Sequence, residues 1–283
     1  MMNATNTYLT NKMFVPNDVH RVIFNKCRLQ TQIKYRLVIK RFNRNLHVVD
    51  FYEIDYRTRW KLTDTILQKH KKVKFLNARD TEITDDGINH MQLHTLNTRY
   101  TEITDEGVKH MRLHTLKARN SQITDDGIKH MQLHTLKARN SQIITDEGIN
   151  HMQLHTLYAN SSRITDEGIK YMQLHTLFTR DSKITDEGIK HMRLHALWAN
   201  DRMTDEGIKH MQLHTLWTSR SQISDEGIKY MQLHTLYAYD SEITDDGIKH
   251  MQLHALYASD RMTYNVRDGV KKLKWKPIKF LSI

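Results

Sequence analysis

The feature that most constrains this chain is a segment of about 20 residues that recurs ten times between residues 73 and 260. One copy reads "LHTLKARNSQITDDGIKHMQ", from Leu113 to Gln132. Successive copies start 20 residues apart, except for one step of 21, where Ile143 and Ile144 are doubled, and one step of 19, before Leu213. A fixed period of this length indicates a solenoid, in which each unit packs only against its neighbours.

The first half of each copy has the alternation of a strand. Leu116 and Ala118 are predicted to face the core, while Thr115, Lys117 and Arg119 point to the opposite side. The chemistry of this surface is therefore determined by the outward-facing residues that vary from copy to copy.

The second half of each copy changes period. Ile128 and Met131, three residues apart, suit a single helical turn. Thr124 and Asp125 precede this turn as expected capping residues. Gly127 is expected to relieve crowding there.

The repeated pattern, with its "ITDEG" segments, resembles the leucine-rich repeat of the type found in F-box proteins. The resemblance covers roughly residues 48–283 and implies an α/β leucine-rich-repeat solenoid. It divides into a degenerate first repeat (48–72), regular repeats (73–260) and a C-terminal cap (261–283). About ten parallel strands are then expected on one concave face, ~4.8 Å apart.

Residues 13–46 do not repeat, and Pro16 followed by apolar residues at helical spacing predicts short helices. The segment resembles an F-box, which implies a small helical F-box-like domain over residues 1–47. A short helical domain of another origin is the alternative. The residues that match the motif and would contact an adaptor are Val15, Pro16, Val19, Ile23, Phe24, Leu37, Val38 and Phe42.

This resemblance implies a protein–protein adaptor. Its N-terminal module would dock on the adaptor subunit of a cullin-RING (SCF-type) ubiquitin ligase, and its repeats would bind the target protein. Proteins of this plan occur in eukaryotes and in some giant viruses. Catalysis would belong to other subunits, so the chain itself is not expected to be an enzyme, and no cofactor is expected.

Composition limits the partners. The net charge of +11 resides at the two ends: residues 1–60 hold 11 Lys/Arg against 4 Asp/Glu, and residues 261–283 hold 7 against 1. A single cysteine, Cys27, excludes an internal disulfide framework. No apolar stretch is long enough for a membrane span, and the first residues do not resemble a secretory signal. We therefore expect an intracellular protein, in the cytoplasm or nucleus, without a membrane partner.

The residue after the second leucine of each copy should face the concavity, and it switches once from polar to aromatic. The second varying position, two residues further on, is basic in the first four copies. The aromatic row could bind a partner or stabilise the fold by stacking, and both readings stay open. The predicted partner-binding residues are Tyr158, Phe178, Trp198, Trp217, Tyr237, Tyr257, Arg79, Arg99, Arg119, Arg139, Lys117 and Lys137.

Two rows of histidines run through the repeats, from His94 to His254 and from His90 to His250. Parallel rows do not converge as metal ligands must, so a half-buried, hydrogen-bonded structural ladder is favoured over a metal site. Nucleic-acid binding through the basic and aromatic positions is the competing function. The near-neutral charge of the repeats and the separation of basic from aromatic copies disfavour it. A repeat protein without a ligase link is a further alternative.

Overall fold

The computed structural model describes residues 50–52, 59 and 61–258. In this part of the chain eleven strands form one parallel sheet whose spatial order is the sequence order. The strands are β1 (Asp50–Phe51), β2 (Phe75–Asn77), β3 (Thr95–Asn97), β4 (Thr115–Lys117), β5 (Thr135–Lys137), β6 (Thr156–Tyr158), β7 (Thr176–Phe178), β8 (Ala196–Trp198), β9 (Thr215–Trp217), β10 (Thr235–Ala238) and β11 (Ala255–Ala258).

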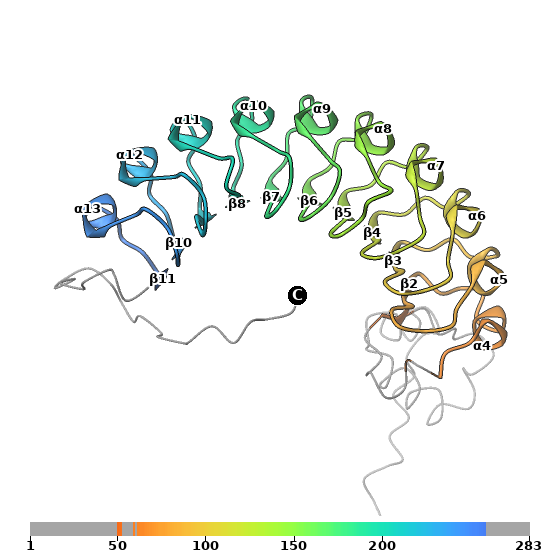
Figure 1. Cartoon of the computed structure of the whole chain (residues 1–283). Coiled ribbons are helices and arrows are strands. Elements are labelled where there is room, and N and C mark those ends of the chain that lie inside the picture. The colour runs from red at the N-terminus through yellow and green to blue at the C-terminus, as the bar shows by residue number, and fades with distance from the viewer. Residues whose placement is uncertain (1–49, 53–58, 60, 259–283) are drawn as a thin grey trace, which may run out of the picture.

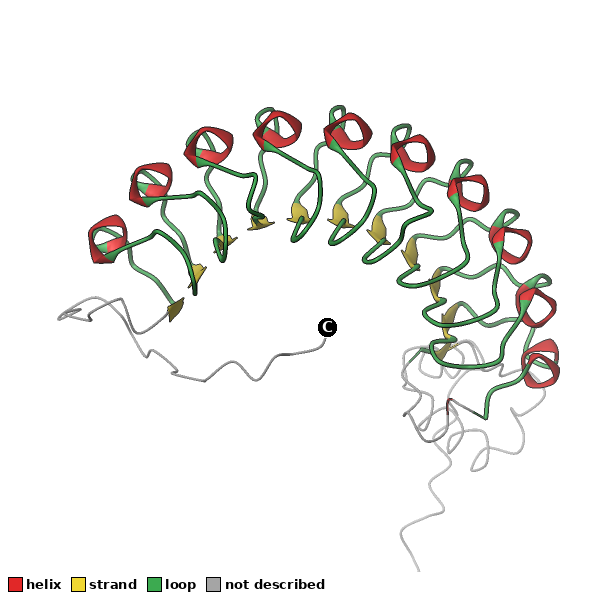
Figure 2. Cartoon of the chain, in the orientation of Figure 1, coloured by secondary structure: helices red, strands yellow, loops and turns green. Residues whose placement is uncertain are grey.

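A short helix follows each strand from β1 to β10. The helices are α4 (Asp64–Gln68), α5 (Asp85–Ile88), α6 (Asp105–Val108), α7 (Asp125–Ile128), α8 (Asp146–Ile149), α9 (Asp166–Ile169), α10 (Asp186–Ile189), α11 (Asp205–Ile208), α12 (Asp225–Ile228) and α13 (Asp245–Ile248). The units stack into an arc whose inner, concave side is lined by the strands and whose outer, convex side carries the helices (Figures 1 and 2). The prediction of an α/β repeat solenoid is confirmed for these residues.

The strands pair in the register that the repeat period dictates. Lys117 of β4 lies opposite Lys137 of β5, and the backbone N–H of Ala118 donates to the carbonyl of Lys137 at 3.0 Å. Leu116 is fully buried, while Thr115 and Lys117 are only partly covered. The predicted alternation of the strand is therefore confirmed.

A tight turn follows each strand in most units. Asn120 there has a φ of 48°, in the left-handed region that Asn and Asp adopt more readily than other residues with a side chain. The chain then crosses to the convex side, where Ile123, Ile128 and Met131 join Leu116 in one continuous core. Each unit buries its apolar side chains against the next unit, as expected for a solenoid.

Neighbouring helices are connected by a carboxylate ladder. The Asp105 carboxylate accepts hydrogen bonds from the backbone N–H (2.8 Å) and hydroxyl (2.6 Å) of Thr124, one unit further along. The Thr124 hydroxyl in turn caps α7 by accepting from the backbone N–H of Asp126. A Cβ added to Gly127 would lie 2.2 Å from the Asp105 Oδ1 atom, so a glycine is required by this close approach.

The two irregular steps of the repeat are absorbed differently. The extra residue, Ile143, is 40% exposed, while Ile144 takes the buried position. The missing residue shortens the turn after β8, and Asn200 is only 2% exposed. Its amide donates to the carbonyls of Thr179 and Ile184. Asn200 occupies the second varying position of its copy, which is expected to face the concavity, but its amide satisfies buried carbonyls instead.

The F-box-like segment lies outside the described residues, as does the C-terminal cap. The degenerate first repeat is described in part: Asp64, at the start of α4, accepts from the backbone N–H and hydroxyl of Thr84, as the equivalent aspartates do in later units. Among the described residues no helix is long and apolar enough to cross a membrane.

Candidate interaction surface

One continuous row along the concave face contains the third residue of each strand from β2 to β11, together with Tyr52, which directly follows β1. The row contains Tyr52, Asn77, Asn97, Lys117, Lys137, Tyr158, Phe178, Trp198, Trp217, Tyr237 and Tyr257. All of these side chains are intermediate in exposure. Tyr52 was not among the predicted site residues. The β1–β2 register, which pairs Phe51 with Leu76, places it there because it directly follows Phe51.

The six aromatic residues Tyr158, Phe178, Trp198, Trp217, Tyr237 and Tyr257, here called the aromatic ladder, stack face to face. Neighbouring ring centroids are 3.5 to 4.2 Å apart, with interplanar angles between 2° and 23°. Each inner ring therefore has both faces covered by its neighbours. What remains for a partner is the row of ring edges, together with the polar groups of Tyr and Trp.

This stacking geometry bears on why the ladder exists. Aromatic pairs are most stable when offset or edge to face, with centroids ~4.5–7 Å apart, because the negative faces of two aligned rings repel. The Trp198–Trp217 pair, at 3.5 Å and 19°, is closer to an aligned sandwich. Optimal stacking energy alone does not explain such an arrangement.

Burial also affects the tyrosines of the ladder. It raises the pKa of Tyr158. Burial, followed by the neighbouring Tyr257, raises the pKa of Tyr237 to about 12. Both phenols thus stay neutral hydrogen-bonding groups at physiological pH.

The proximal half of the concave face carries Arg79, Arg99, Arg119, Arg139, Lys117 and Lys137, here called the cationic patch. These residues belong to four consecutive units, from β2 to β5. Burial, then the charges of Arg139 and Arg99, lowers the pKa of Arg119. The like charges in these adjacent units are therefore close enough to destabilise one another.

Lys137 lies where the cationic patch meets the aromatic ladder. Its ammonium nitrogen is 3.8 Å from the centroid of the Tyr158 ring. Burial, then the charge of Lys117, lowers the pKa of Lys137 to about 8. Desolvation and like charge thus favour the neutral amine at this position.

Lys117 extends the row toward the N-terminus. Its ammonium nitrogen lies 4.9 Å from the centroid of the Tyr52 ring. Between these two residues the Asn97 amide donates to the Asn77 side-chain oxygen at 3.0 Å. Ring, cation and amide contacts therefore join most neighbours of the row.

The residue after the arginine differs between the three units of Arg99, Arg119 and Arg139 and the other units with a basic residue. It is Tyr100, Asn120 or Asn140 after the three inner arginines, and Asp80 after Arg79. In the distal half Asp181 lies 3.5 Å from Arg180, and Asp240 lies 3.6 Å from Arg220. Carboxylates are thus present beside the distal basic residues and absent from the same positions at Arg99, Arg119 and Arg139.

The first histidine row forms a second ladder, here called the histidine stack, immediately before the strands. Nine rings from His94 to His254 stack with centroids 4.4 to 4.7 Å apart. In several units the Nδ1 atom lies within hydrogen-bond distance of the next threonine hydroxyl, as between His114 and Thr115 at 3.3 Å. The expectation that these rings are half-buried is wrong. They are exposed, because each lies directly before the N-terminal end of its strand.

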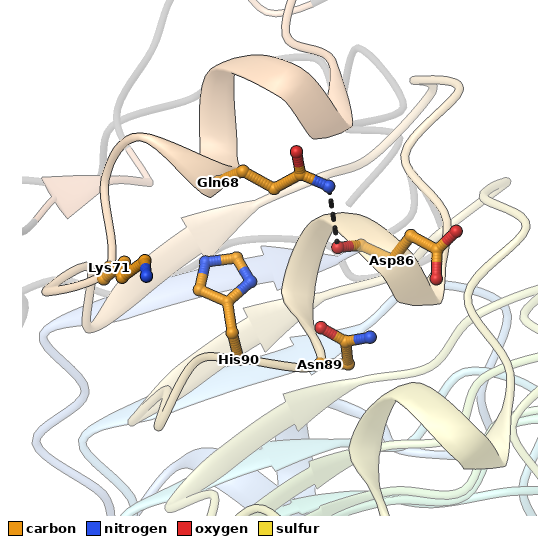
Figure 3. Close-up of a pocket in the computed structure, with 5 residues that line it drawn as sticks. All are labelled: Gln68, Lys71, Asp86, Asn89 and His90. Atoms are coloured by element: carbon orange, nitrogen blue, oxygen red, sulfur yellow. Dashed lines mark hydrogen bonds between the residues drawn. The ribbon is translucent and has the colours of Figure 1, made fainter.

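A metal site does not emerge from these rows. In the described part of the chain no group of three or more His, Cys, Asp or Glu residues is arranged to hold an ion. The second histidine row lies with the helices on the convex side. There a hollow between α4 and α5 is lined by Gln68, Lys71, Asp86, Asn89 and His90 (Figure 3). A similar hollow lies between α12 and α13, so these hollows follow from helix spacing.

The convex side is also balanced in charge. In most units a lysine at the end of the helix pairs with an acid three residues earlier, as Lys129 does with Asp126 at 2.7 Å. Exposed pairs of this kind contribute little to stability, at ~0–1 kcal/mol each. The concave face, with its clustered cations and partly covered rings, is the more distinctive surface.

The structure thus brings together all twelve predicted partner-binding residues on one side of the arc. The eight predicted adaptor-binding residues, Val15, Pro16, Val19, Ile23, Phe24, Leu37, Val38 and Phe42, lie outside the described residues. In comparisons with known proteins, no family model matches the chain and no curated protein matches its sequence.

Proposed function

We propose that this protein is an interaction scaffold that binds a partner protein on its concave face. The observation that carries the proposal is the continuous row of the cationic patch and the aromatic ladder, joined by the 3.8 Å contact between Lys137 and Tyr158. Tyr, Trp and Arg dominate the binding energy of protein interfaces. Their alignment on one concave sheet suits the binding of another protein along that surface.

The proposed role in the cell is that of a substrate-recognition subunit of a cullin-RING ubiquitin ligase. The support for this role is the F-box resemblance of residues 13–46, followed in the chain by repeats that resemble leucine-rich repeats. In this arrangement the N-terminal segment docks on the ligase adaptor, and the concave face presents the bound target. The protein acts by positioning, without catalytic residues of its own, inside the cell.

Nucleic-acid binding is the second candidate, favoured by the cationic patch. A nucleic acid would need phosphate contacts along the groove and open ring faces for base stacking. The inner rings of the aromatic ladder have both faces covered, as Trp198 does between Phe178 and Trp217. This alternative predicts that Arg99→Ala with Arg119→Ala weakens binding most, with a steep dependence on salt.

A site-specific photocrosslink tests the proposal. Benzoylphenylalanine replaces Phe178 on the concave face or, as a matched control, Tyr230, which is 77% exposed beside the convex helix α12. Irradiation in cell lysate should give a protein adduct at position 178 alone, and the adduct should survive nuclease treatment. Equal adducts at both positions, or loss of the adduct with nuclease, would contradict the proposal.

A further inference from the structure

The cationic patch favours anionic groups and the aromatic ladder favours apolar groups, and the two surfaces are adjacent in one row. From the register of β5 and β6, Lys137 and Tyr158 lie directly opposite each other, with no unit between the two surfaces. A partner segment that crosses this junction must therefore change character at the same point. We infer that the concave face binds an extended polypeptide segment whose anionic side chains lie over the cationic patch and whose apolar side chains lie over the aromatic ladder.

The end of the partner segment that lies over the cationic patch is expected to be anionic, because the cations of the patch repel one another. Lys117 and Lys137 lie opposite each other in β4 and β5, and the Arg119 guanidinium lies among the charges of its own row. A carboxylate or phosphate placed between them would replace this repulsion by charge-assisted hydrogen bonds. Both anions satisfy the same requirement, so the segment is defined here by charge.

The apolar end is set by the ring edges. The edges of stacked rings are apolar and weakly positive, and they pack against aliphatic groups or against the face of a further ring at right angles. A second aromatic side chain from the partner can therefore make the T-shaped contact that the rings of the ladder do not make with one another. Tyr257 at β11 is the last ring of the ladder.

The carboxylates of the distal half determine which end of the partner segment lies over which half of the concave face. Asp181 and Asp240 occupy the turn position that is Asn120 and Asn140 in the cationic patch, where the first unit alone has an aspartate, Asp80, paired with Arg79 at 2.8 Å. An anionic group over the distal half would meet carboxylates that already neutralise Arg180 and Arg220, whereas over the units of Arg99, Arg119 and Arg139 it meets cations without a carboxylate at this position. One placement of the segment is thus favoured over the reverse.

The size of the segment follows from the strand spacing. Because Arg79 in the unit of β2 is already paired with Asp80, the segment is counted from β3, and eight steps separate β3 from β11 in the sheet. At ~4.8 Å per step these are spanned by roughly 11 to 12 extended residues. The inference rests on the proposed function, because it names the kind of partner segment that the concave face takes.

Fluorescein-labelled synthetic peptides of 12 residues test this inference on the full chain. The first two peptides carry four glutamates grouped at one end and leucine and tyrosine at the other, in either chain direction. The third has the same composition with the glutamates dispersed. A fourth replaces the glutamates of the grouped peptide by phosphoserine and separates carboxylate from phosphate recognition. At least one grouped peptide should bind about tenfold more tightly than the dispersed one, measured by fluorescence anisotropy.

Variants assign the two ends of the peptide. Lys117→Gln with Lys137→Gln should abolish the advantage of the grouped peptide. Trp198→Ala with Trp217→Ala should weaken grouped and dispersed peptides alike. The control pair Lys129→Gln with Lys190→Gln, in salt bridges on the convex side, should change neither affinity.

Equal affinity for grouped and dispersed peptides would overturn the inference, as would the absence of binding by every peptide. These results are separable from failure of the proposed function. If the crosslink at position 178 captures a protein while the peptides show no preference for grouped charge, the scaffold role stands and the partner segment is of another kind. If position 178 gives no adduct, the scaffold role itself fails.

Discussion

The ammonium nitrogen of Lys137 lies 3.8 Å from the centre of the Tyr158 ring, at the point where the concave face changes from basic to aromatic. The two residues face each other across β5 and β6 because the repeats pair in register. One unit of the solenoid thus supplies the last cation, and the next supplies the first ring. Each side of this junction can be tested separately.

The first prediction concerns the charge of Lys137. Its pKa, lowered to about 8 by burial and then by Lys117, should be visible in side-chain NMR spectra of lysine-labelled protein. Lys117→Gln should raise that pKa, because the like charge is removed. Lys129 is the matched control, since its hydrogen bond to Asp126 raises its pKa. Simultaneous titration of Lys137 and Lys129 would show that Lys137 is not in the environment described.

The second prediction concerns the carboxylate ladder between helices. Gly127→Ala places a methyl group 2.2 Å from the Asp105 Oδ1 atom and 3.2 Å from its Cα atom. Overpacking of this kind costs ~1–3 kcal/mol of unfolding free energy. Urea unfolding of this variant should show the loss, whereas Gln132→Ala, at an exposed position, should not. Wild-type stability of Gly127→Ala would mean that the helices are not in this close contact.

The third prediction concerns acid. Although these rings are exposed, partial desolvation, followed by the charge of the neighbouring rings, lowers the pKa of His114, His134, His175 and His234 in the folded protein. The unfolded chain therefore binds protons more readily. Stability should be constant above the unfolded pKa of about 6.5 and fall as the pH drops through that value to below the folded pKa values.

Thermal unfolding between pH 8 and pH 5 measures this effect. Replacing His134 and His175 by Gln should make the decline with falling pH shallower. Replacing His130 and His191, which lie beside the convex helices and outside the histidine stack, should leave the decline as in the wild type. A midpoint that does not change across this range would contradict the electrostatic account of the stack.

The fourth prediction concerns the N-terminal segment. If residues 13–46 are an F-box, Pro16→Ala with Ile23→Ala should abolish copurification of the ligase adaptor while circular dichroism of the repeats stays unchanged. Thr10→Ala, outside the resemblance, is the control. Retention of the adaptor by the double variant would remove the link to the ubiquitin ligase.

Much of the fold could be predicted from the repeat itself. In a parallel solenoid each residue stacks on its equivalent in the next unit, so the inward position of Leu116 and the outward position of Lys117 follow from one copy. The rows on the concave face follow for the same reason. The close approach of Gly127 to the preceding aspartate also has a sequence signal, since a glycine and an aspartate recur in every "TDDG" or "TDEG" segment.

Other features depend on three-dimensional details that one copy does not contain. The Asn200 side chain points into the core because the connection after β8 is one residue shorter, and its amide donates to buried carbonyls there. The exposure of His114 depends on the path of the chain just before the N-terminal end of β4. The 3.5 Å separation of Trp198 and Trp217 is shorter than the strand spacing of ~4.8 Å, because side chains that project to the inner side of the arc converge. Neither the spacing of the repeats nor their composition predicts how strongly the arc curves.

We propose that the aromatic ladder binds a partner and does not serve the fold alone. The most direct measurement is the affinity of Trp198→Ala with Trp217→Ala for the partner captured at position 178, taken together with the melting temperature of the same variant. We expect a loss of ~2 kcal/mol or more of binding free energy for each tryptophan, with a much smaller effect on stability. Unchanged affinity accompanied by a sharp fall in melting temperature would contradict it and would make the ladder a structural element.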